Sequence, residues 1–558
     1  MRPEISRTVI LDGYVDEPAC LGVPPYMAPY PRYVAGAVPG EVFYYTIDRL
    51  RSDRSVLEVM NAADLVVVIA GVTVPGKYLG GTPATLQELE KYMAAVTATK
   101  ILGGPLPMFG AGTEGGRRAK KISSSSSFDI VATGDIEAVV AGYVEDGRSV
   151  DPGLRRTARD VARWAARGAR IAPQHPDFPH TMIELETYRG CFRGNCSFCT
   201  EKFYGRPDFR SVPDIVDEVS ALYDLGIRHF RLGRQPDLLA YGARGDAEFP
   251  RPDPEAIRRL YSGIRHVAPQ LKVLHMDNAN PGTIAAHPEE CREILKTIVR
   301  YHTSGDVAAF GMESADPHVI RLNSLKARPE DVKEAIRIVN EVGGARGSSG
   351  LPELLPGLNF VHGLIGETKK TFQLNYEFLE SLLADGLLVR RINVRQVMPF
   401  EGTCMGEVGD KIAGRHKGIF HAYKEKIREH IDLEMLRRVV PAGTVLRDVR
   451  MELRDGSLTF GRQIATYPLL AGVPAELPVG SFADLKVVSH GYRSITAVPY
   501  PLDVNRAPMK LLEHLPSVGK SRAAAIARGR PYPGPEAFVS ALDDPAVARG
   551  LLEFLEFR

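Results

Sequence analysis

Three cysteines, Cys191, Cys196 and Cys199, lie within nine residues of the stretch YRGCFRGNCSFCTEKFYGRP, residues 188–207. Six cysteines in 558 residues are too few for a secreted disulfide scaffold, so clustered thiols indicate metal ligands. A structural zinc site takes four Cys or His ligands, normally in two separated pairs. The other three cysteines and the 14 histidines show no paired spacing, which makes zinc a weaker alternative.

The number of clustered cysteines also argues against a ferredoxin-type cluster, which is held by four cysteines. Chance clustering of core thiols is a further alternative. Three ligands directly after a strand instead indicate an iron–sulfur cluster in which one iron has no protein ligand and is open to a substrate or cofactor.

A repeated pattern of strand followed by helix must position these cysteines. The strand candidates are residues 182–188, 228–233, 272–277, 307–312, 357–363 and 391–397. Sequential βα units predict a parallel sheet with right-handed crossovers. We therefore expect an α/β fold with a full or partial (β/α)6 barrel over residues 181–414 and functional groups at the carboxyl ends of its strands.

Other patterns surround this barrel. Residues 1–150 predict a doubly wound α/β domain, with strands at 8–14, 64–72 and 99–107 and a helix at 82–98 that begins at Thr82. Residues 151–180 form a helical linker that ends in prolines. Residues 415–500 predict a helix and a small OB/TRAM-like β-domain with a hairpin at Asp455-Gly456, and residues 501–558 predict short helices.

Composition is that of an ordinary soluble globular protein, with 44% hydrophobic and 25% charged residues. The net charge of +2 gives no global attraction to nucleic acid or membrane, so any basic surface must be local. No apolar run reaches the roughly 18 residues of a membrane span. We expect a cytoplasmic protein with no membrane partner.

The cysteine loop resembles that of the radical S-adenosylmethionine (SAM) enzymes, in which a strand ends in C-x3-C-x2-C with an aromatic residue before the last cysteine. Phe198 occupies the aromatic position. The departure is one extra residue between Cys191 and Cys196, which Gly194 and Asn195 are suited to absorb.

Three later segments resemble the Elongator-type branch of that superfamily, in the expected order. They are FGMESADPHVIRLNSLKARPEDVKEAI (310–336), LNFVHGLIGETKKTF (358–372) and VRQVMPFEGT (394–403). The chain is therefore identified as a member of the radical SAM superfamily.

The resemblance implies a [4Fe-4S] cluster on Cys191, Cys196 and Cys199, whose open iron chelates SAM. One electron, from a donor such as ferredoxin or flavodoxin, then gives a 5′-deoxyadenosyl radical. It also implies that Phe198 lies near the adenine and that three residues make polar contacts to SAM, namely Glu313, Lys326 and Asn359. Alternatively, these three are an ordinary surface ion pair, a solvated lysine and a strand-end cap.

One element of the family is replaced. Where the second strand usually ends in G-G-E, this chain reads RLGRQPDLL, residues 231–239. Gln235 then stands at the carboxylate position, where its amide oxygen accepts a hydrogen bond without the charge.

The first domain resembles the cobalamin-binding domains of another radical SAM branch, through GGPLP (103–107) and GDIEAVV (134–140). It has no D-x-H-x-x-G motif and no histidine, so cobalamin is a minor alternative to a scaffolding or substrate role. The methylthiotransferases, another related class, use three N-terminal cysteines for a second cluster. Only Cys20 precedes Cys191, which argues against that chemistry.

Residues 502–530 resemble a helix-hairpin-helix with the turn LPSVGK, although Ser517 stands at its first glycine position. Such turns bind phosphate through amides at a helix N-terminus. Gly519, Lys520 and Arg522 are the nucleic-acid-binding candidates, and protein docking or packing is the alternative role.

These features together predict a radical SAM enzyme that modifies a nucleic acid, most plausibly tRNA. Radical modification of a protein or small metabolite, with the tail as a docking element, is the alternative. A non-catalytic iron–sulfur protein that binds nucleic acid is a third hypothesis.

Overall fold

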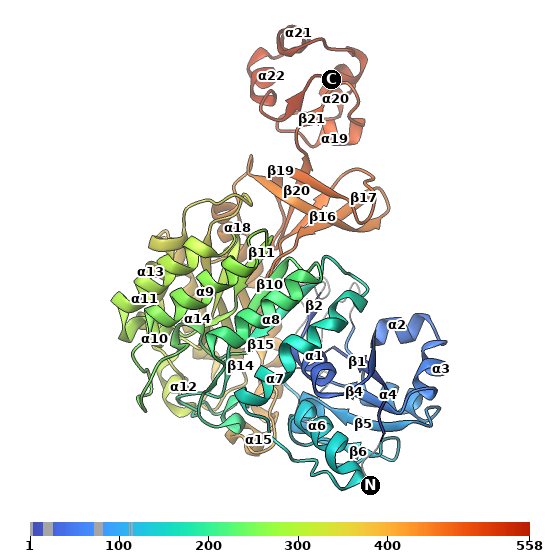
Figure 1. Ribbon diagram of the computed structural model, residues 1–558. Helices are drawn as coiled ribbons and strands as arrows, with labels where there is room; N and C mark the ends of the chain where they lie inside the picture. Colours follow the sequence, from blue (N-terminus) through green and yellow to red (C-terminus); the bar gives the residue numbers. More distant parts are fainter. Residues whose placement is uncertain (1–3, 15–25, 72–81, 111, 113–114) are drawn as a thin grey trace.

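The computed structural model describes residues 4–14, 26–71, 82–110, 112 and 115–558 (Figure 1). Cys20 lies outside the described residues. Within the described part of the chain, no helix has both the length and the apolar composition that crossing a membrane requires.

The first unit is a five-stranded parallel sheet in the order β3-β1-β4-β5-β6. Its strands are β1 (Arg7–Asp12), β3 (Glu41–Thr46), β4 (Leu65–Ile69), β5 (Thr99–Gly103) and β6 (Ile130–Val131). Its helices include α2 (Ile47–Ser52), α3 (Val56–Asn61), α4 (Leu86–Met93), α5 (Pro105–Phe109) and α6 (Ile136–Asp146). This is the strand order of flavodoxin-like doubly wound folds.

Two predicted elements of this unit were wrong in extent. The strand expected at 99–107 ends at Gly103, because Gly104 has φ +94 and leads into helix α5. The helix expected at 82–98 begins after Thr85, whose hydroxyl accepts a hydrogen bond from Glu88 N at 3.3 Å. Thr85, rather than Thr82, is therefore its N-cap.

The first unit and the barrel interlock. Strand β2 (Tyr26–Met27) pairs in parallel with β7 (Met182–Glu186), the first barrel strand, and helix α1 (Pro29–Ala37) packs against α6 and α7 (Ala158–Gly168). From α1, the fully buried Arg32 donates to Glu218 Oε1 at 2.8 Å, on barrel helix α8 (Val212–Asp224). Because an unpaired buried charge is costly, this pair fixes the two units together.

The barrel strands form two four-stranded parallel sheets, β11-β10-β7-β2 and β12-β13-β14-β15. Only one residue, Asp277, separates β11 from β12, so the third strand passes from one sheet to the other. The strands are β7 (Met182–Glu186), β10 (His229–Gly233), β11 (Val273–Met276), β12 (Asn278–Ala279), β13 (Asp306–Glu313), β14 (Leu354–His362) and β15 (Arg391–Gln396). The predicted strand positions thus correspond closely to the observed ones.

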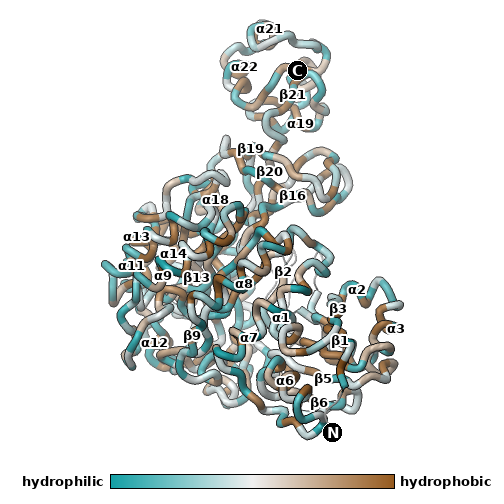
Figure 2. Tube along the Cα trace, viewed as in Figure 1, coloured by the Kyte–Doolittle hydropathy of each residue, from teal (hydrophilic) through white to brown (hydrophobic). Residues whose placement is uncertain are grey.

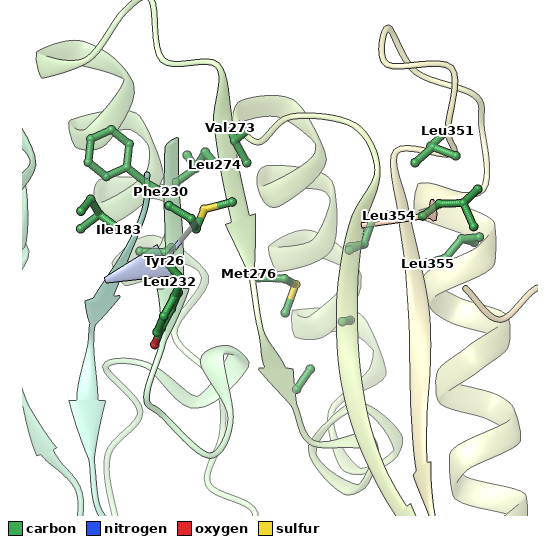
Figure 3. Packing of buried hydrophobic residues seen from close by; sticks show 14 of the residues in the cluster. Tyr26, Ile183, Phe230, Leu232, Val273, Leu274, Met276, Leu351, Leu354 and Leu355 are labelled. Atoms are coloured by element: carbon green, nitrogen blue, oxygen red, sulfur yellow. The ribbon is translucent and has the colours of Figure 1, made fainter. Parts of the chain in front are cut away.

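Helices cover the outside of these sheets, and apolar side chains fill the layer between. The covering helices are α8 (Val212–Asp224), α9 (Pro254–Val267), α10 (Pro281–Ala286), α11 (Pro288–Tyr301), α12 (Pro317–Leu322), α13 (Pro329–Gly343) and α14 (Lys369–Ala384). Hydrophobic and hydrophilic stretches alternate along the chain (Figure 2), and the buried apolar side chains form a large core cluster. Tyr26 lies in this interior beside Ile183 and Leu232 (Figure 3), so β2 extends the barrel core.

After the barrel come α15 (Cys404–Val408), α16 (Lys411–Arg415), α17 (Lys417–Ile427) and α18 (Leu433–Val439), then a small closed β-barrel. Its strand order is β16-β17-β18-β20-β19, with β18 and β20 parallel, which is the order of an OB fold. The strands are β16 (Val445–Asp455), β17 (Leu458–Gln463), β18 (Leu470–Val473), β19 (Phe482–His490) and β20 (Ser494–Pro499).

The small barrel closes the amino end of the larger barrel of parallel strands. From its β17–β18 loop, Tyr467 donates to Asp277 Oδ1 at 2.6 Å and lies 4.2 Å from the Arg391 guanidinium. Arg493, which follows β19, donates to Asp432 Oδ2 at 2.7 Å. Polar contacts from two loops therefore hold the small barrel in place.

The tail contains α19 (Met509–Glu513), α20 (Lys520–Arg528), α21 (Pro535–Ala541), α22 (Pro545–Leu551) and the short strands β21 (Leu502–Asp503) and β22 (Leu555–Glu556). The nearly buried ammonium of Lys486, on β19, binds Glu553 Oε2 at 2.9 Å and lies 4.3 Å from the Phe554 ring. The tail and small barrel lie at one end of the molecule, and α15 lies at the other (Figure 1).

Candidate active site

The cysteine loop is a closed turn at the carboxyl end of β7. Strand β8 (Tyr188–Arg189) pairs with β9 (Asp208–Phe209) across its base, and Cys191 N donates to Gly205 O at 3.1 Å. Gly190 and Gly194 have φ +88 and +61, a region open to glycine at little cost. The loop therefore folds back on itself and turns its three cysteines together.

The three thiols are half-buried and close enough to affect one another electrostatically. Burial raises the pKa of Cys199 to about 12. Burial also raises the pKa of Cys196, against the opposing effect of Lys326 and Arg193. Since metal ligation needs thiolates, these cations favour the ligand form of Cys196.

The donor set is three thiols from one loop, and thiolates are the ligands that iron–sulfur clusters use. Among the described residues, no group of three His, Cys, Asp or Glu side chains is placed as the ligands of one metal ion would be. The other described cysteines are Cys291, buried in α11, and Cys404, exposed on α15.

Glu313 and Lys326 meet above Gly311, at the carboxyl end of β13. A Cβ on Gly311 would lie 2.6 Å from Lys326 Nζ and would overlap Glu313 Oε1. Glu313 has φ +60, a conformation that is uncommon for a non-glycine residue. Both side chains also act electrostatically on Cys196, so the structure gathers an anion and a cation beside the thiols.

Phe198 packs against an apolar cluster next to the cysteine loop, which includes Val361, Leu364 and Met405. Asn359 lies opposite Gly311 in the strand register and donates to Phe310 O at 3.3 Å. Both residues therefore border the region of the thiols, Glu313 and Lys326.

Gln235 is buried in a structural position. Its side-chain oxygen accepts a hydrogen bond from Thr187 Oγ1 at 3.2 Å, and its amide nitrogen donates to Leu232 O at 3.0 Å. These bonds link the end of β10 to the residue after β7. Arg234, beside it, has φ +60 and places its guanidinium on the Tyr30 hydroxyl.

The nucleic-acid candidates of the tail lie apart from this site (Figure 1). Gly519 is the N-cap of α20 and has open space around it, and Lys520 is exposed. The Arg522 guanidinium binds Asp543 Oδ1 at 2.9 Å and also contacts Ser517 O. Its charge is therefore partly neutralised within the tail.

The described interface between the first unit and the barrel is tightly packed. Phe109, on α5, stacks on Phe203 with ring centres 5.9 Å apart and meets Tyr204 edge-on at the same distance. A cavity of about 10 Å³ remains at this interface, room for one water. The first unit offers no histidine to ligate a cobalt ion, since the first histidine of the chain is His175.

Sequence reasoning missed Arg193, Gly311 and Asp237. Asp237 accepts hydrogen bonds from Thr283 Oγ1 at 2.6 Å and Asn280 N at 3.0 Å, while burial raises its pKa to about 6. The G-x-E-S motif could have indicated Gly311, because it stands two residues from Glu313. Nothing in the local pattern marks the other two.

The family model described as the radical SAM superfamily matches residues 185–379, which contain the cysteine loop, Glu313 and Lys326. The chain belongs to the radical SAM superfamily. As a radical SAM protein with this site it is an enzyme, and the family implies a [4Fe-4S] cluster and SAM as its cofactors.

Relatives are found that match nearly the whole chain or about half of it. An uncharacterized protein of Archaeoglobus fulgidus is 46% identical over 513 residues, which cover 91% of this chain and 93% of that protein. A Thermus thermophilus protein named ribosomal protein uS12 methylthiotransferase RimO is 27% identical over 308 residues, covering 54% of this chain and 65% of that protein.

Among solved structures, the apo form of the cobalamin-dependent SAM radical enzyme OxsB matches with a TM-score of 0.50 and 12% identity. The match covers 76% of this chain and 56% of that one. It supports the shared fold of the parallel-sheet units and says nothing of cofactor or substrate.

Proposed function

We propose that this enzyme, as a member of the Elongator-type branch, cleaves SAM reductively at a [4Fe-4S] cluster held by Cys191, Cys196 and Cys199 and modifies a nucleic acid, with tRNA the preferred substrate. The observation that carries the proposal is the gathering of three thiols beside Glu313 and Lys326 at the carboxyl ends of the strands.

Different residues of the site contact different parts of SAM. When bound, the cluster supplies the electron that yields a 5′-deoxyadenosyl radical from SAM. Glu313 suits the ammonium of the methionine moiety and Lys326 its carboxylate, because charge-assisted hydrogen bonds are the strong ones. Phe198 offers an apolar face to the adenine, and Asn359 a polar contact. The electron donor is a ferredoxin or flavodoxin.

A large nucleic acid fits the arrangement of the modules. The small barrel has the strand order of OB folds, many of which bind oligonucleotides. Gly519 and Lys520 open α20 at an exposed helix N-terminus. Because the tail and the cysteine loop lie at opposite ends of the molecule, a substrate that contacts both must be long, as a folded RNA is.

A protein substrate is the second candidate, because relatives of this chain are named as enzymes of ribosomal protein uS12. The methylthiotransferase chemistry of those names is not proposed here, since only Cys20 precedes Cys191. Cobalamin stays a minor alternative, because residues 1–150 contain no histidine to ligate its cobalt.

The proposal is tested by anaerobic reconstitution with iron and sulfide, followed by dithionite and SAM. We expect 5′-deoxyadenosine, and more of it with tRNA from cells that lack the gene than with ribosomal proteins. Mass mapping of tRNA from cells with and without the gene then identifies the modified nucleotide. A reconstituted enzyme that forms no 5′-deoxyadenosine contradicts the reaction, and identical tRNA maps contradict the substrate.

A further inference from the structure

A run of exposed cations lies at the carboxyl end of the barrel, on a segment of the first unit. We name residues 115–121 the basic strap; its exposed cations are Arg117, Arg118, Lys120 and Lys121. Its backbone is fixed to the segment after the last barrel strand. Gly116 N donates to Val397 O at 2.9 Å, and Ala119 N donates to Pro399 O at 3.0 Å.

The same rim segment contacts the cysteine loop. Met405 N donates to Ser197 O at 3.0 Å, and a Cβ on Gly402 would lie 3.1 Å from the Phe203 ring. The segment 397–406 thus separates the strap from the cysteine loop and touches both. The strap is therefore at the site end of the molecule, opposite the tail.

The surroundings of the strap are positively charged. Lys411, Arg415 and Lys417 are exposed on the neighbouring α16 and the start of α17. Residues 115–121 and 397–417 together hold seven lysines and arginines against three acidic residues, in a chain whose net charge is only +2. Arg117 lies 3.8 Å from Asp410. In the described part of the chain, no carboxylate lies within ion-pair distance of Arg118, Lys120 or Lys121.

We propose that the basic strap binds the phosphate backbone of the nucleic acid while the target nucleotide is at the cysteine loop. This rests on the substrate class proposed above and assigns the contact to a surface distinct from the tail. Lysine and arginine contacts to phosphate position a nucleic acid and release counterions, so binding becomes salt-dependent.

The test compares two triple variants of the full-length reconstituted enzyme. The strap variant is Arg118→Ala, Lys120→Ala and Lys121→Ala, which leaves the pair of Arg117 with Asp410 in place. The matched control is Lys272→Ala, Lys296→Ala and Arg300→Ala, three exposed cations around β11 and α11. Binding of unfractionated tRNA is measured by fluorescence anisotropy from about 50 to about 300 mM salt, a range that brackets physiological ionic strength.

We expect the strap variant to bind tRNA at least about tenfold more weakly at low salt. The slope of the logarithm of the binding constant against the logarithm of the salt concentration should become less steep by roughly two. The control should bind like the unmodified enzyme. Equal losses in both variants, or no loss in the strap variant, would overturn the proposal. SAM cleavage without substrate should stay unchanged in both variants. If the unmodified enzyme binds no tRNA yet cleaves SAM, the nucleic-acid substrate itself is refuted, and a protein partner is favoured.

A separate observation concerns the extra residue in the cysteine loop. With four residues between Cys191 and Cys196, the turn is long enough to bring Arg193 back over the second cysteine. Arg193 Nη1 donates to Cys196 Sγ at 3.5 Å, and Nη2 donates to Ser324 O at 3.1 Å. Its Nε pairs with Glu248, and its guanidinium lies 5.7 Å from the Phe249 ring.

These contacts hold the guanidinium in one place, with the side chain only 8% exposed. Hydrogen bonds to cluster sulfurs and shielding from solvent are among the factors that set the reduction potential. A fixed cation also stabilises the form of the cluster that carries an added electron. We infer that Arg193 raises the reduction potential of the cluster proposed above, which gives the longer turn a function.

The readout is the midpoint potential from a redox titration followed by electron paramagnetic resonance. Arg193→Ala should lower the midpoint, and a tenfold change in the reduction equilibrium corresponds to about 59 mV for one electron. Arg206→Ala is the control, because Arg206 donates to Phe192 O at 3.0 Å in the same loop without bonding a cysteine.

Measuring the iron content distinguishes an error about Arg193 from an error about the cluster itself. An intact cluster with an unchanged midpoint in Arg193→Ala, or an equal shift in Arg206→Ala, would overturn the role of Arg193. Failure of the unmodified protein to take up iron would instead refute the cluster and with it the proposed function. Arg193→Lys should recover part of the potential, since it keeps the charge and loses the forked geometry.

Discussion

At the carboxyl end of the radical SAM barrel, three non-glycine residues have positive φ: Arg234 at 60°, Glu313 at 60° and Ser324 at 49°. At the amino end, polar side chains instead form hydrogen-bonded pairs between residues whose φ is not positive. His302 Nδ1 lies 3.0 Å from Asp306 Oδ2 there, and the Tyr467 hydroxyl bonds Asp277. The two ends of the barrel therefore differ: the carboxyl end has unusual backbone conformations, and the amino end has paired polar side chains.

This difference indicates that the carboxyl end serves function and the amino end serves stability of the fold. Residues in sparsely populated backbone regions persist only where the surroundings hold them, and they cluster at active sites. The carboxyl end holds such residues around the three thiols, whereas the amino end holds hydrogen bonds, such as that of Tyr467 to Asp277, which attach the small barrel. Changes at the first end should therefore affect cofactors with little effect on the fold, and changes at the second end the reverse.

The largest effect is expected for Cys196→Ala at the carboxyl end. Loss of one of three cluster ligands should remove most of the bound iron and all 5′-deoxyadenosine formation. Because Cys196 lies in a loop and is only partly buried, the melting temperature of the apoprotein should change by no more than about 2 °C. Iron analysis and thermal unfolding of the same sample check both parts; near-complete iron retention would show that Cys196 is no ligand.

Gly311→Ala should come next. Its added Cβ would lie 2.6 Å from Lys326 Nζ, so the cation and Glu313 must move. We expect SAM affinity to fall about tenfold or more, roughly 1.4 kcal/mol, with the iron content unchanged.

The matched control is Gly418→Ala on α17, where nothing lies within 4 Å of the added Cβ. Calorimetric titration of both reconstituted variants with SAM measures the difference. Equal affinity in Gly311→Ala and the unmodified enzyme would separate Glu313 and Lys326 from SAM binding.

Tyr467→Phe tests the amino end. Removing the hydroxyl leaves Asp277 Oδ1 without its 2.6 Å bond, which should cost about 1 to 3 kcal/mol. Hydrogen exchange of residues 464–469 should increase, while cluster content and midpoint stay constant. Tyr492→Phe, at a side chain 48% exposed, is the control with no expected effect. A changed midpoint in Tyr467→Phe would mean that the two ends are coupled.

The smallest effect is a pH dependence of stability at the same end. Although burial opposes it, bonding to Asp306 and Glu353 raises the pKa of His302 above 6.5. Its stabilisation is thus complete below about pH 6.5 and is lost as pH rises through the folded-state pKa. The difference in melting temperature between the unmodified protein and His302→Gln should shrink from pH 6 to pH 9; a difference that grows would contradict the sign.

His229, the first residue of β10, should show the opposite sign. Burial lowers its pKa from 6.5 to about 3, so the folded state binds fewer protons than the unfolded state between these values. The contribution of the neutral side chain is lost as pH falls from about 6.5. His229→Gln should therefore differ most from the unmodified protein above pH 6.5, in melts recorded over the same buffers.

Much of the barrel could be predicted from sequence because its signals are local. Apolar runs give the strands within a few residues, and the spacing of Cys191, Cys196 and Cys199 gives the loop. The G-x-E-S motif indicated Glu313, and turn chemistry at Asp455-Gly456 located the hairpin between β16 and β17.

The features that sequence did not reveal depend on contacts between distant segments. Strand β2 joins the barrel sheet through a partner more than 150 residues away, and two residues are too few for a periodic pattern. Tyr467 reaches Asp277 from another module. The basic strap is held at the barrel rim by backbone bonds to Val397 and Pro399, which no local sequence pattern indicates.

The central claim is that three cysteines hold a cluster whose open iron receives SAM. It is tested most directly by electron paramagnetic resonance of the reconstituted, dithionite-reduced protein before and after SAM is added. The account predicts the signal of a reduced [4Fe-4S] cluster that changes on addition of SAM, and a weaker response in Gly311→Ala. A cluster signal that SAM leaves unchanged would contradict it.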